Sequence, residues 1–333
     1  MHHLSIRTRL ILIILICQLV GLVAVAFSIQ ETLNEHVDSI ASTSLENARD
    51  TFNNLQQQDI RMMSALLESL MVNETFQKLF EAKDRIKLLA ATTPLQKTLH
   101  EKYGISHWYF HHTEDKRSVY LRVHVPTFFD DQIKRPLYFD AIKKQTFASG
   151  LELGKTAYAL RVIHPFRNNA GKLLGYMELG EELDHFIETM KRQTGDEIAI
   201  LLDKKYLSEK EWGSLTSNKN IKNTWNDYEN FVLTSATVNE PSIFKLEEKI
   251  SDIPESGLVL ASGQYANLFF TRSIFPIFDS AKNKIGAVFV LKNATSHHDE
   301  MKKSGFKIFG IVFGISLLLA LMLSIYLKKY MNL

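Results

Sequence analysis

The sequence has little cysteine and no excess of charge of one sign. Its 333 residues include a single cysteine, Cys17, and 39 lysines and arginines nearly balance 37 aspartates and glutamates, for a net charge of +2. One cysteine excludes a disulfide-stabilised fold, so the chain can fold unchanged in an oxidising compartment. A balanced charge offers no basic field for phosphate groups, and we therefore expect no nucleic acid among the partners.

The signatures of common catalytic and metal sites are also missing. There is no Gly-rich phosphate loop and no nucleophile elbow, so the sequence predicts neither an enzyme nor a cofactor. Several histidines cluster between His100 and His124, but His111 and His112 point to opposite faces of a strand. Without cysteines or a tight ligand motif, we predict no metal site.

Two long stretches carry no charge at all. Residues 10–29 and 308–327 are each 20 residues long and strongly apolar. At about 1.5 Å per residue, a helix of this length spans about 30 Å, the thickness of the hydrocarbon core of a bilayer. We therefore predict transmembrane helices at 10–29 and 305–327, with the lipid bilayer as a partner.

The positions of the basic residues predict the orientation in the membrane. Arg7 and Arg9 precede the first span, whereas the first basic residue after it is Arg49. This asymmetry places residues 1–9 in the cytoplasm, the central region outside, and residues 328–333 in the cytoplasm as a short stub. The first span is either a retained anchor or a cleaved signal, and the unbroken helical pattern after it favours the anchor.

Residues 30–72 are expected to form one long helix. Apolar side chains recur there at steps of three, four or seven residues, from Leu33 to Leu70, and no glycine or proline interrupts them. The apolar stripe either packs on its own domain or pairs with a second protomer, and the pattern fits both interpretations.

Shorter helices are expected near residues 74–92 and 94–103. Thr93 is a suitable N-cap for the second of them, and Gly104 is suited to end it. With the long helix, the first of them makes residues 30–93 a helical region that leads into the domains.

The central region contains an internal repeat. Four residues of one segment recur 111 positions later, across two strand-like stretches and a turn-rich loop of equal length. They are Arg161, Ile163, Pro165 and Gly175, which match Arg272, Ile274, Pro276 and Gly286. One offset held over this length predicts two tandem α+β modules, a membrane-distal one at residues 94–194 and a membrane-proximal one at 195–304.

The first module begins with a predicted β-hairpin of residues 106–113 and 118–126, joined by a polar turn at 114–117. If Thr113 pairs with Ser118, the alternation of side chains along the two strands gives the hairpin one apolar and one polar face. The apolar face carries Trp108, Phe110, Leu121, Val123 and Val125, and the polar face carries His107, Tyr109, His111, Tyr120, Arg122 and His124. The polar face is either exposed to solvent or the wall of a ligand cavity.

Several motifs of the first module resemble a known family in order and spacing. They are Phe110-His111, residues 118–126, Asp130-Asp131, Arg135, Gly150-Leu151-Glu152-Leu153-Gly154, residues 160–165 and residues 175–180. They resemble the double Cache sensor domains of bacterial transmembrane receptors, in the branch called dCache type 3 or the double sensory domain of two-component sensor kinases. Weaker similarity continues through the second module to Asn293.

The resemblance implies an α+β fold of two PAS-like modules on a long N-terminal helix, flanked by two transmembrane helices. It also implies a ligand pocket in the membrane-distal module, a homodimer, and a location in the bacterial inner membrane with the central region periplasmic or extracellular. Receptors of this kind end in a chemotaxis, kinase or diguanylate cyclase domain. Only six residues follow the second span here, so the sequence is either a fragment or a short protein.

We therefore expect the ligand-sensing region of a signalling receptor, which passes a conformational signal through the second span. The alternative is a membrane-anchored binding or scaffold protein without an output domain. The candidate ligand-binding residues are Tyr109, His111, Tyr120, Arg122, His124, Asp131, Arg135, Glu152, Arg161 and Glu178. Arginines suit carboxylates and the glutamates suit amines, which predicts a small anionic or zwitterionic metabolite. The arginines can instead form internal ion pairs with these acids.

Overall fold

The computed structural model describes residues 6–113, 117–154, 158–219, 221–238 and 241–330. Most of the expected hairpin turn, at residues 114–116, and parts of both predicted cytoplasmic ends lie outside the described residues. The chain divides into two compact units. One comprises Met1–Thr43, Val259–Arg272 and Lys292–Leu333, and the other comprises Ser44–Leu258 and Ser273–Leu291.

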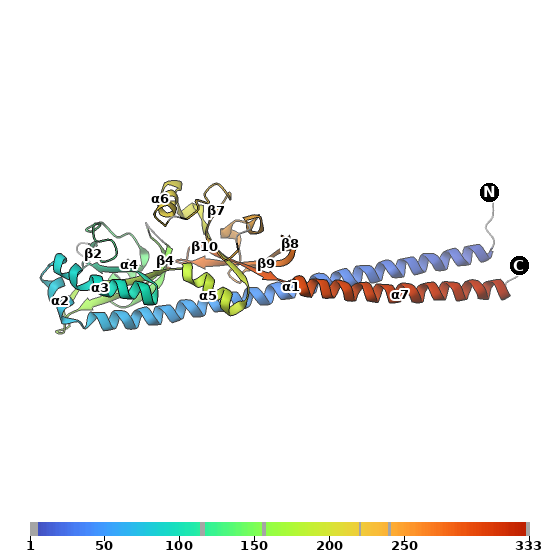
Figure 1. Ribbon diagram of the computed structural model, residues 1–333, viewed down its shortest axis with the longest axis horizontal. Helices are drawn as coiled ribbons and strands as arrows, with labels where there is room; N and C mark the ends of the chain where they lie inside the picture. Colours follow the sequence, from blue (N-terminus) through green and yellow to red (C-terminus); the bar gives the residue numbers. More distant parts are fainter. Residues whose placement is uncertain (1–5, 114–116, 155–157, 220, 239–240, 331–333) are drawn as a thin grey trace. The chain divides into compact units, whose positions relative to one another are not determined.

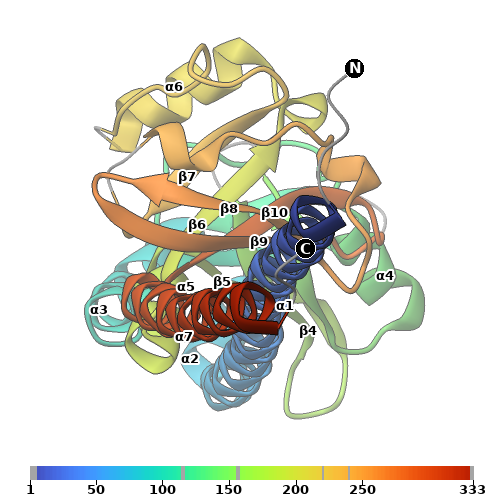
Figure 2. The same cartoon turned by 90° about the vertical axis from the view of Figure 1, so that its right-hand side faces the viewer.

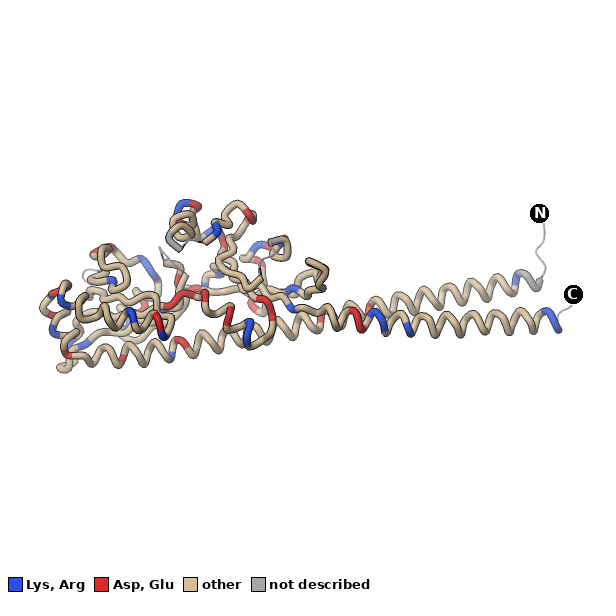
Figure 3. Tube along the Cα trace, viewed as in Figure 1, with Lys and Arg blue, Asp and Glu red and all other residues tan. Residues whose placement is uncertain are grey.

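The first unit contains the two most apolar helices of the chain. Helix α1 (Ile6–Met71) begins in this unit, and α7 (Thr295–Tyr330) lies beside it (Figures 1 and 2). Stretches of both helices have mean hydropathies of 3.0 and 2.7 and are long and apolar enough to cross a membrane. Figure 3 shows these stretches free of charged residues.

Helices α1 and α7 pack closely at two points. The side-chain amide of Gln18 donates a hydrogen bond to the carbonyl oxygen of Ser316 at 3.0 Å. Gly305 faces Ile29, and a Cβ atom at position 305 would lie 2.6 Å from Ile29 Cγ2. A glycine is therefore what permits this close approach.

The second unit begins with the remainder of α1, which packs along the domain it precedes. Phe52 contacts Phe186 and Phe275, at 5.5 and 5.8 Å between ring centroids. The apolar stripe of this part of α1 therefore packs on its own domain. Beyond Leu55 the buried apolar residues of α1 are Ile60, Met63 and Leu67, whereas the regular steps of the sequence place Met62 and Leu66 on the stripe. The positions differ because strict seven-residue steps drift around a helix of 3.6 residues per turn.

The helices that follow differ from the expected break at Thr93. Helix α2 spans Glu74–Glu81, and α3 runs from Arg85 to Tyr103 with Pro94 inside it. Asp84 is the N-cap of α3 and accepts a hydrogen bond from Lys87 N at 3.0 Å, whereas the Thr93 hydroxyl donates to the carbonyl oxygen of Leu89. The predicted cap is wrong because Asp84 provides the stronger start, but the predicted end at Gly104 is confirmed.

The first module is a five-stranded antiparallel sheet with helix α4 on one face. Its elements are β1 (Ile105–His111), β2 (Val119–Arg122), α4 (Pro136–Lys144), β3 (Ala148–Leu153), β4 (Tyr158–Arg167) and β5 (Leu173–Glu182), followed by α5 (Asp184–Thr194). The strand order is β2-β1-β5-β4-β3. Aromatic residues fill the face opposite α4, where Phe80 packs against Phe110 and Phe166.

The second sheet repeats the first. Its elements are β6 (Glu197–Asp203), a 3-10 turn at Lys204–Tyr206, α6 (Glu209–Lys219), β7 (Phe231–Ala236), 3-10 turns at Pro241–Phe244 and Ile250–Asp252, β8 (Leu258–Tyr265), β9 (Leu268–Phe278) and β10 (Lys284–Asn293). The order β7-β6-β10-β9-β8 matches the first sheet strand for strand. Strand β10 begins and ends 111 residues after β5, which confirms the predicted repeat and the α+β class.

The repeated glycines have the same role in both sheets. A Cβ atom at Gly175 in β5 would collide with the carbonyl oxygen of His111 in β1. A Cβ atom at Gly286 in β10 would collide with the carbonyl oxygen of Leu201 in β6. Both positions therefore require a residue without a side chain where two strands meet.

Replacement of either glycine by alanine is expected to destabilise the protein by about 2–4 kcal/mol, because a backbone atom cannot move aside as a side chain can. Denaturant unfolding of the full chain in detergent measures this loss for Gly175→Ala and Gly286→Ala. The control is Gly213→Ala in α6, where the nearest atom is 3.9 Å away and alanine favours the helix. Equal stabilities of all three variants would contradict the steric explanation.

Candidate ligand-binding site

The candidate site lies on the sheet face that α4 covers. Tyr109 of β1 pairs directly with Glu178 of β5, and Arg161 of β4 pairs with Gly180 of the same strand. Because side chains alternate along a strand, Tyr109, Arg161 and Glu178 project from one face. Arg135 reaches this face from the N-terminus of α4.

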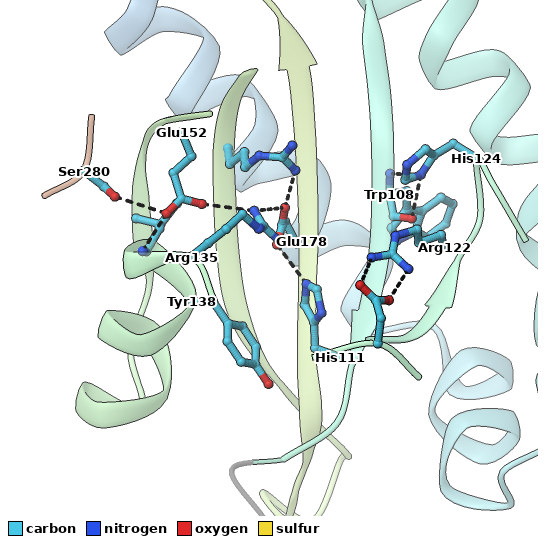
Figure 4. Close-up of polar contacts among 12 residues, drawn as sticks. Trp108, His111, Arg122, His124, Arg135, Tyr138, Glu152, Glu178 and Ser280 are labelled. Carbon is cyan, nitrogen blue, oxygen red and sulfur yellow. Dashed lines mark hydrogen bonds and ion pairs between the residues drawn. The ribbon is translucent and has the colours of Figure 1, made fainter. Parts of the chain in front are cut away.

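Glu178 is the centre of a buried ion-pair network (Figure 4). Its Oε1 accepts from Arg135 Nη1 at 2.8 Å and from Arg161 Nη1 at 2.6 Å, and its Oε2 accepts from Arg135 Nη2 at 2.7 Å. His111 Nε2 lies 2.8 Å from the same Oε2. The carboxylate is fully buried, and every oxygen has at least two donors around it.

The charges around Glu178 decide the protonation states. Burial by itself would raise the pKa of Glu178, but the guanidinium groups of Arg135 and Arg161 outweigh it and hold this pKa well below its usual range. Burial lowers the pKa of His111, although Glu178 opposes the shift. The imidazole is therefore neutral, and its Nε2–H donates to the carboxylate.

Glu152 extends the network toward the second module. Its Oε2 accepts from Arg135 Nη1 at 3.1 Å, and its Oε1 accepts from the backbone N–H of Leu137 at 2.7 Å and from the hydroxyl of Ser280 at 3.2 Å. Figure 4 shows Ser280 reaching Glu152 from a separate segment of the chain. Burial raises the pKa of Glu152, against the opposing charge of Arg135.

A second ion pair stands beside the network. Arg122 forms a two-pronged contact with Asp131, at 2.6 and 2.9 Å, and also donates to the carbonyl oxygen of Phe128 at 2.7 Å. The two side chains are partly exposed, at 11% and 18%. This pair is therefore more accessible than the buried pairs of Glu178.

The histidines of this face are neutral. His107 and His124 pack edge to face, with ring centroids 4.8 Å apart, and His107 stacks parallel to Tyr109. Burial lowers the pKa of His124 to about 4 and that of His107 well below its usual value, and the charge of Arg161 adds to both shifts. These rings therefore contribute hydrogen bonding and packing at neutral pH.

A cavity of about 410 Å³ lies in front of these residues, within the size range of ligand pockets. Four cationic side chains line it, those of Arg122, Lys134, Arg135 and Arg161, and Asp131 is the single carboxylate among the described lining residues. The guanidinium carbons of Arg122, Arg135 and Arg161 lie 5.4, 5.6 and 5.6 Å from the ring centroid of Tyr109. Glu152 and Glu178 lie behind this wall.

Comparison with known proteins identifies the fold family. The family model described as the double sensory domain of two-component sensor kinase (dCache_3) matches residues 39–249, which is more than half of the chain. The chain belongs to this family. Its members are sensory domains of receptors, and the expected double Cache resemblance is confirmed.

Solved structures similar to this double Cache chain are also sensor domains. The periplasmic domain of Vibrio cholerae LuxQ is 9% identical, with a TM-score of 0.43, and the match covers 75% of this chain and 98% of that one. The sensor domain of the V. cholerae histidine kinase DctB is 10% identical, with a TM-score of 0.43 and coverages of 79% and 98%.

The ligand-binding domain of the Campylobacter jejuni chemoreceptor Tlp3, in complex with 4-methylisoleucine, is 12% identical. Its TM-score is 0.33, and the match covers 74% of this chain and 92% of that one. No curated protein sequence matches the chain.

The structure of this double Cache module gathers most of the predicted residues. Tyr109, Arg122, His124, Asp131, Arg135 and Arg161 line the cavity, whereas His111, Glu152 and Glu178 lie behind it. The hairpin register is as predicted at Tyr109, which pairs with Arg122, but it shifts at His111, which pairs with Val119. The predicted face of Tyr120 is wrong, because this bulge turns its ring onto Phe80 on the opposite face.

Sequence reasoning missed several residues of the cavity wall, among them Lys134 and Phe128. Lys134 and Phe128 line the cavity from the irregular segment between β2 and α4, which has no periodicity to reveal its orientation. The basic pair Lys134-Arg135 beside a helix-starting proline was the available signal. Lys134 makes no ion pair with any residue that the structure describes.

Glu178→Gln is expected to cost about 3–5 kcal/mol of unfolding free energy, because it leaves the buried guanidinium groups of Arg135 and Arg161 without their shared carboxylate. Chemical denaturation of the full chain in detergent measures this change. Glu188→Gln removes the same charge from the exposed side of α5 and is expected to stay within about 0.5 kcal/mol of the wild type. A loss no larger than that of the control would show that the network carries little stability.

Proposed function

We propose that the first module of this double Cache receptor region binds a small anionic metabolite through a carboxylate. The observation that carries the proposal is the charge of the cavity wall, in which four cationic side chains face one carboxylate. Glu152 and Glu178 pair with Arg135 and Arg161, and Asp131 pairs with Arg122, so Lys134 leaves the cavity wall with an excess of positive charge. A cavity with this polarity favours an anion over an amine.

Arg122 and Lys134 are the proposed ligand contacts. The planar fork of Arg122 matches a carboxylate in two-pronged geometry, and its present partner, Asp131, is partly exposed. A ligand carboxylate would share or replace this partner, while Lys134 supplies a further positive charge without breaking an ion pair. Asp131 remains available for the amino group of a zwitterion, and the ring of Tyr109 forms an apolar floor.

We also infer that the chain spans the bacterial inner membrane twice, with both modules in the periplasm. The two apolar helices and the membership in a family of receptor sensor domains support this location. The expected homodimer and the type of output domain stay predictions.

The binding proposal is tested by thermal shift of the full chain, extracted from membranes with detergent, against small carboxylates, amino acids and amines. At a concentration about 100 times Kd, a ligand should raise the melting temperature by roughly 5 °C. Carboxylates are expected to stabilise, and amines without a carboxylate are not. Recovery of the chain without detergent would contradict the membrane location.

Arg122→Gln is expected to abolish the shift caused by the best carboxylate. The matched control is Arg85→Gln, which removes an arginine from an ion pair with Asp130 outside this cavity and should keep the shift. The proposal is overturned if no carboxylate stabilises the wild type or the control. It is also overturned if Arg122→Gln responds to the best carboxylate as the wild type does.

The signal is proposed to leave the site through Glu152. Arg135 lines the cavity and contacts Glu152, which accepts from the hydroxyl of Ser280 in the β9–β10 turn. The backbone N–H of Ser280 also donates to the carbonyl oxygen of Leu151 at 3.0 Å. Strand β10 leads directly into α7, so a movement of Arg135 on ligand binding has a continuous path to the second candidate span.

Ser280→Ala is expected to keep the Kd of the best carboxylate within about threefold while removing the effect of this ligand on the β9–β10 turn. Hydrogen exchange of the turn, with and without ligand, measures that effect. Ser256→Ala, an exposed serine before β8, is the control and should behave as the wild type. A ligand-induced change of equal size in all three proteins would exclude this route.

A further inference from the structure

A second polar cluster lies away from the cavity. Asp59 of α1, Glu181 of β5 and His185 of α5 each place one potential ligand atom within 4.8 Å of the others. Glu181 is three residues beyond Glu178, so alternation along β5 turns it toward the opposite face of the sheet. Asp59 is more than 100 residues from the other two in the sequence, so no metal-ligand spacing motif predicts this cluster.

Glu181 is the most constrained member of the cluster. Its side chain is 1% exposed, and neither carboxylate oxygen receives a hydrogen bond from any residue that the structure describes. Burial and the adjacent negative charge of Asp59 raise the pKa of Glu181 to about 9. An unpaired carboxylate is costly at this depth, so the group needs a proton or a cation.

The imidazole ring of His185 lies beside the carboxylate of Asp59. Its Nδ1 lies 3.1 Å from the backbone carbonyl oxygen of Glu182, to which it donates, and its Nε2 lies 3.2 Å from Asp59 Oδ2. With the proton on Nδ1, a neutral ring directs the Nε2 lone pair at the carboxylate. In this tautomer the cluster gathers acceptor atoms without a positive charge between them, and a cation at Nε2 would take the place of the proton that an ion pair of His185 with Asp59 requires.

We propose that Asp59, Glu181 and His185 bind a divalent transition-metal cation of the Zn²⁺ class. One imidazole nitrogen and two carboxylate oxygens form a ligand set that suits Zn²⁺, whereas Mg²⁺ and Ca²⁺ prefer oxygen alone. A single divalent cation balances both carboxylates. The bond from His185 Nδ1 to a backbone carbonyl is the support that metal-ligating histidines typically have.

The geometry needs little adjustment. Ligand atoms about 2.0–2.2 Å from Zn²⁺ in a tetrahedral arrangement lie about 3.3 Å from one another. The separation of Asp59 and His185 is already 3.2 Å, so a small rotation of the Glu181 carboxyl completes the triangle. The fourth position faces outward, because His185 and Asp59 are 44% and 19% exposed, and water can occupy it.

The bound cation would join three elements. Asp59 belongs to α1, Glu181 lies near the end of β5, and His185 lies in the first turn of α5, which leads to the second module. A metal that binds the folded arrangement stabilises it, so Zn²⁺ would hold α1 against the first module. This role is independent of the carboxylate cavity.

The test uses the full chain in detergent, freed of metal with a chelator and titrated with ZnCl2 by calorimetry. The wild type is expected to bind Zn²⁺ through this cluster and to melt at a higher temperature when loaded, while MgCl2 has no effect. Glu181→Gln and His185→Ala are each expected to weaken binding about tenfold or more. Both variants should fold, since glutamine keeps the buried shape and His185 is half-exposed.

The controls are Glu182→Gln, which removes the same charge one residue away, and His100→Ala, which removes an exposed histidine of α3. Both are expected to bind Zn²⁺ as the wild type does. The proposal is overturned if the wild type binds no Zn²⁺ or if Glu181→Gln and His185→Ala bind it unchanged while melting cooperatively. In either case protons, rather than a cation, balance the cluster.

Discussion

A buried negative charge organises the first module. The carboxylate of Glu178 is fully buried, and it is stable there only because Arg135, Arg161 and His111 all donate to it. These partners come from α4, β4 and β1, so one charge fixes the position of a helix and two strands relative to β5. The cavity depends on this arrangement, because Arg135 and Arg161 line its wall while they pair with Glu178.

The second module shows that the fold does not require this network. Its strands have the same order, but Phe289 occupies the position equivalent to Glu178 and packs against Phe244 at 5.6 Å between ring centroids. The equivalent of His164 is likewise a phenylalanine, Phe275. The same scaffold therefore supports an apolar core in one copy and a polar site in the other, and the site rather than the fold carries the function.

Strand β5 presents opposite chemistry on its two faces. Toward α4 it offers Glu178, whose neighbours supply more than enough positive charge. Toward α1 it offers Glu181, whose neighbours Asp59 and His185 supply acceptors. The carboxylate of Glu178 is thus neutralised by arginines of the protein, whereas the carboxylate of Glu181, three residues later, needs a bound cation or a proton.

Much of the fold followed from patterns that lie within short stretches of sequence. Four features were predictable because periodicity depends on local geometry. They are the uncharged runs, the long amphipathic stripe, the 111-residue offset and the pairing of Tyr109 with Arg122. Tertiary structure decided the rest. The bulge that turned Tyr120 away depends on partners distant in the chain, and so does the choice between ion pairing and ligand contact for Arg135 and Arg161. No local pattern contains the positions of these partners.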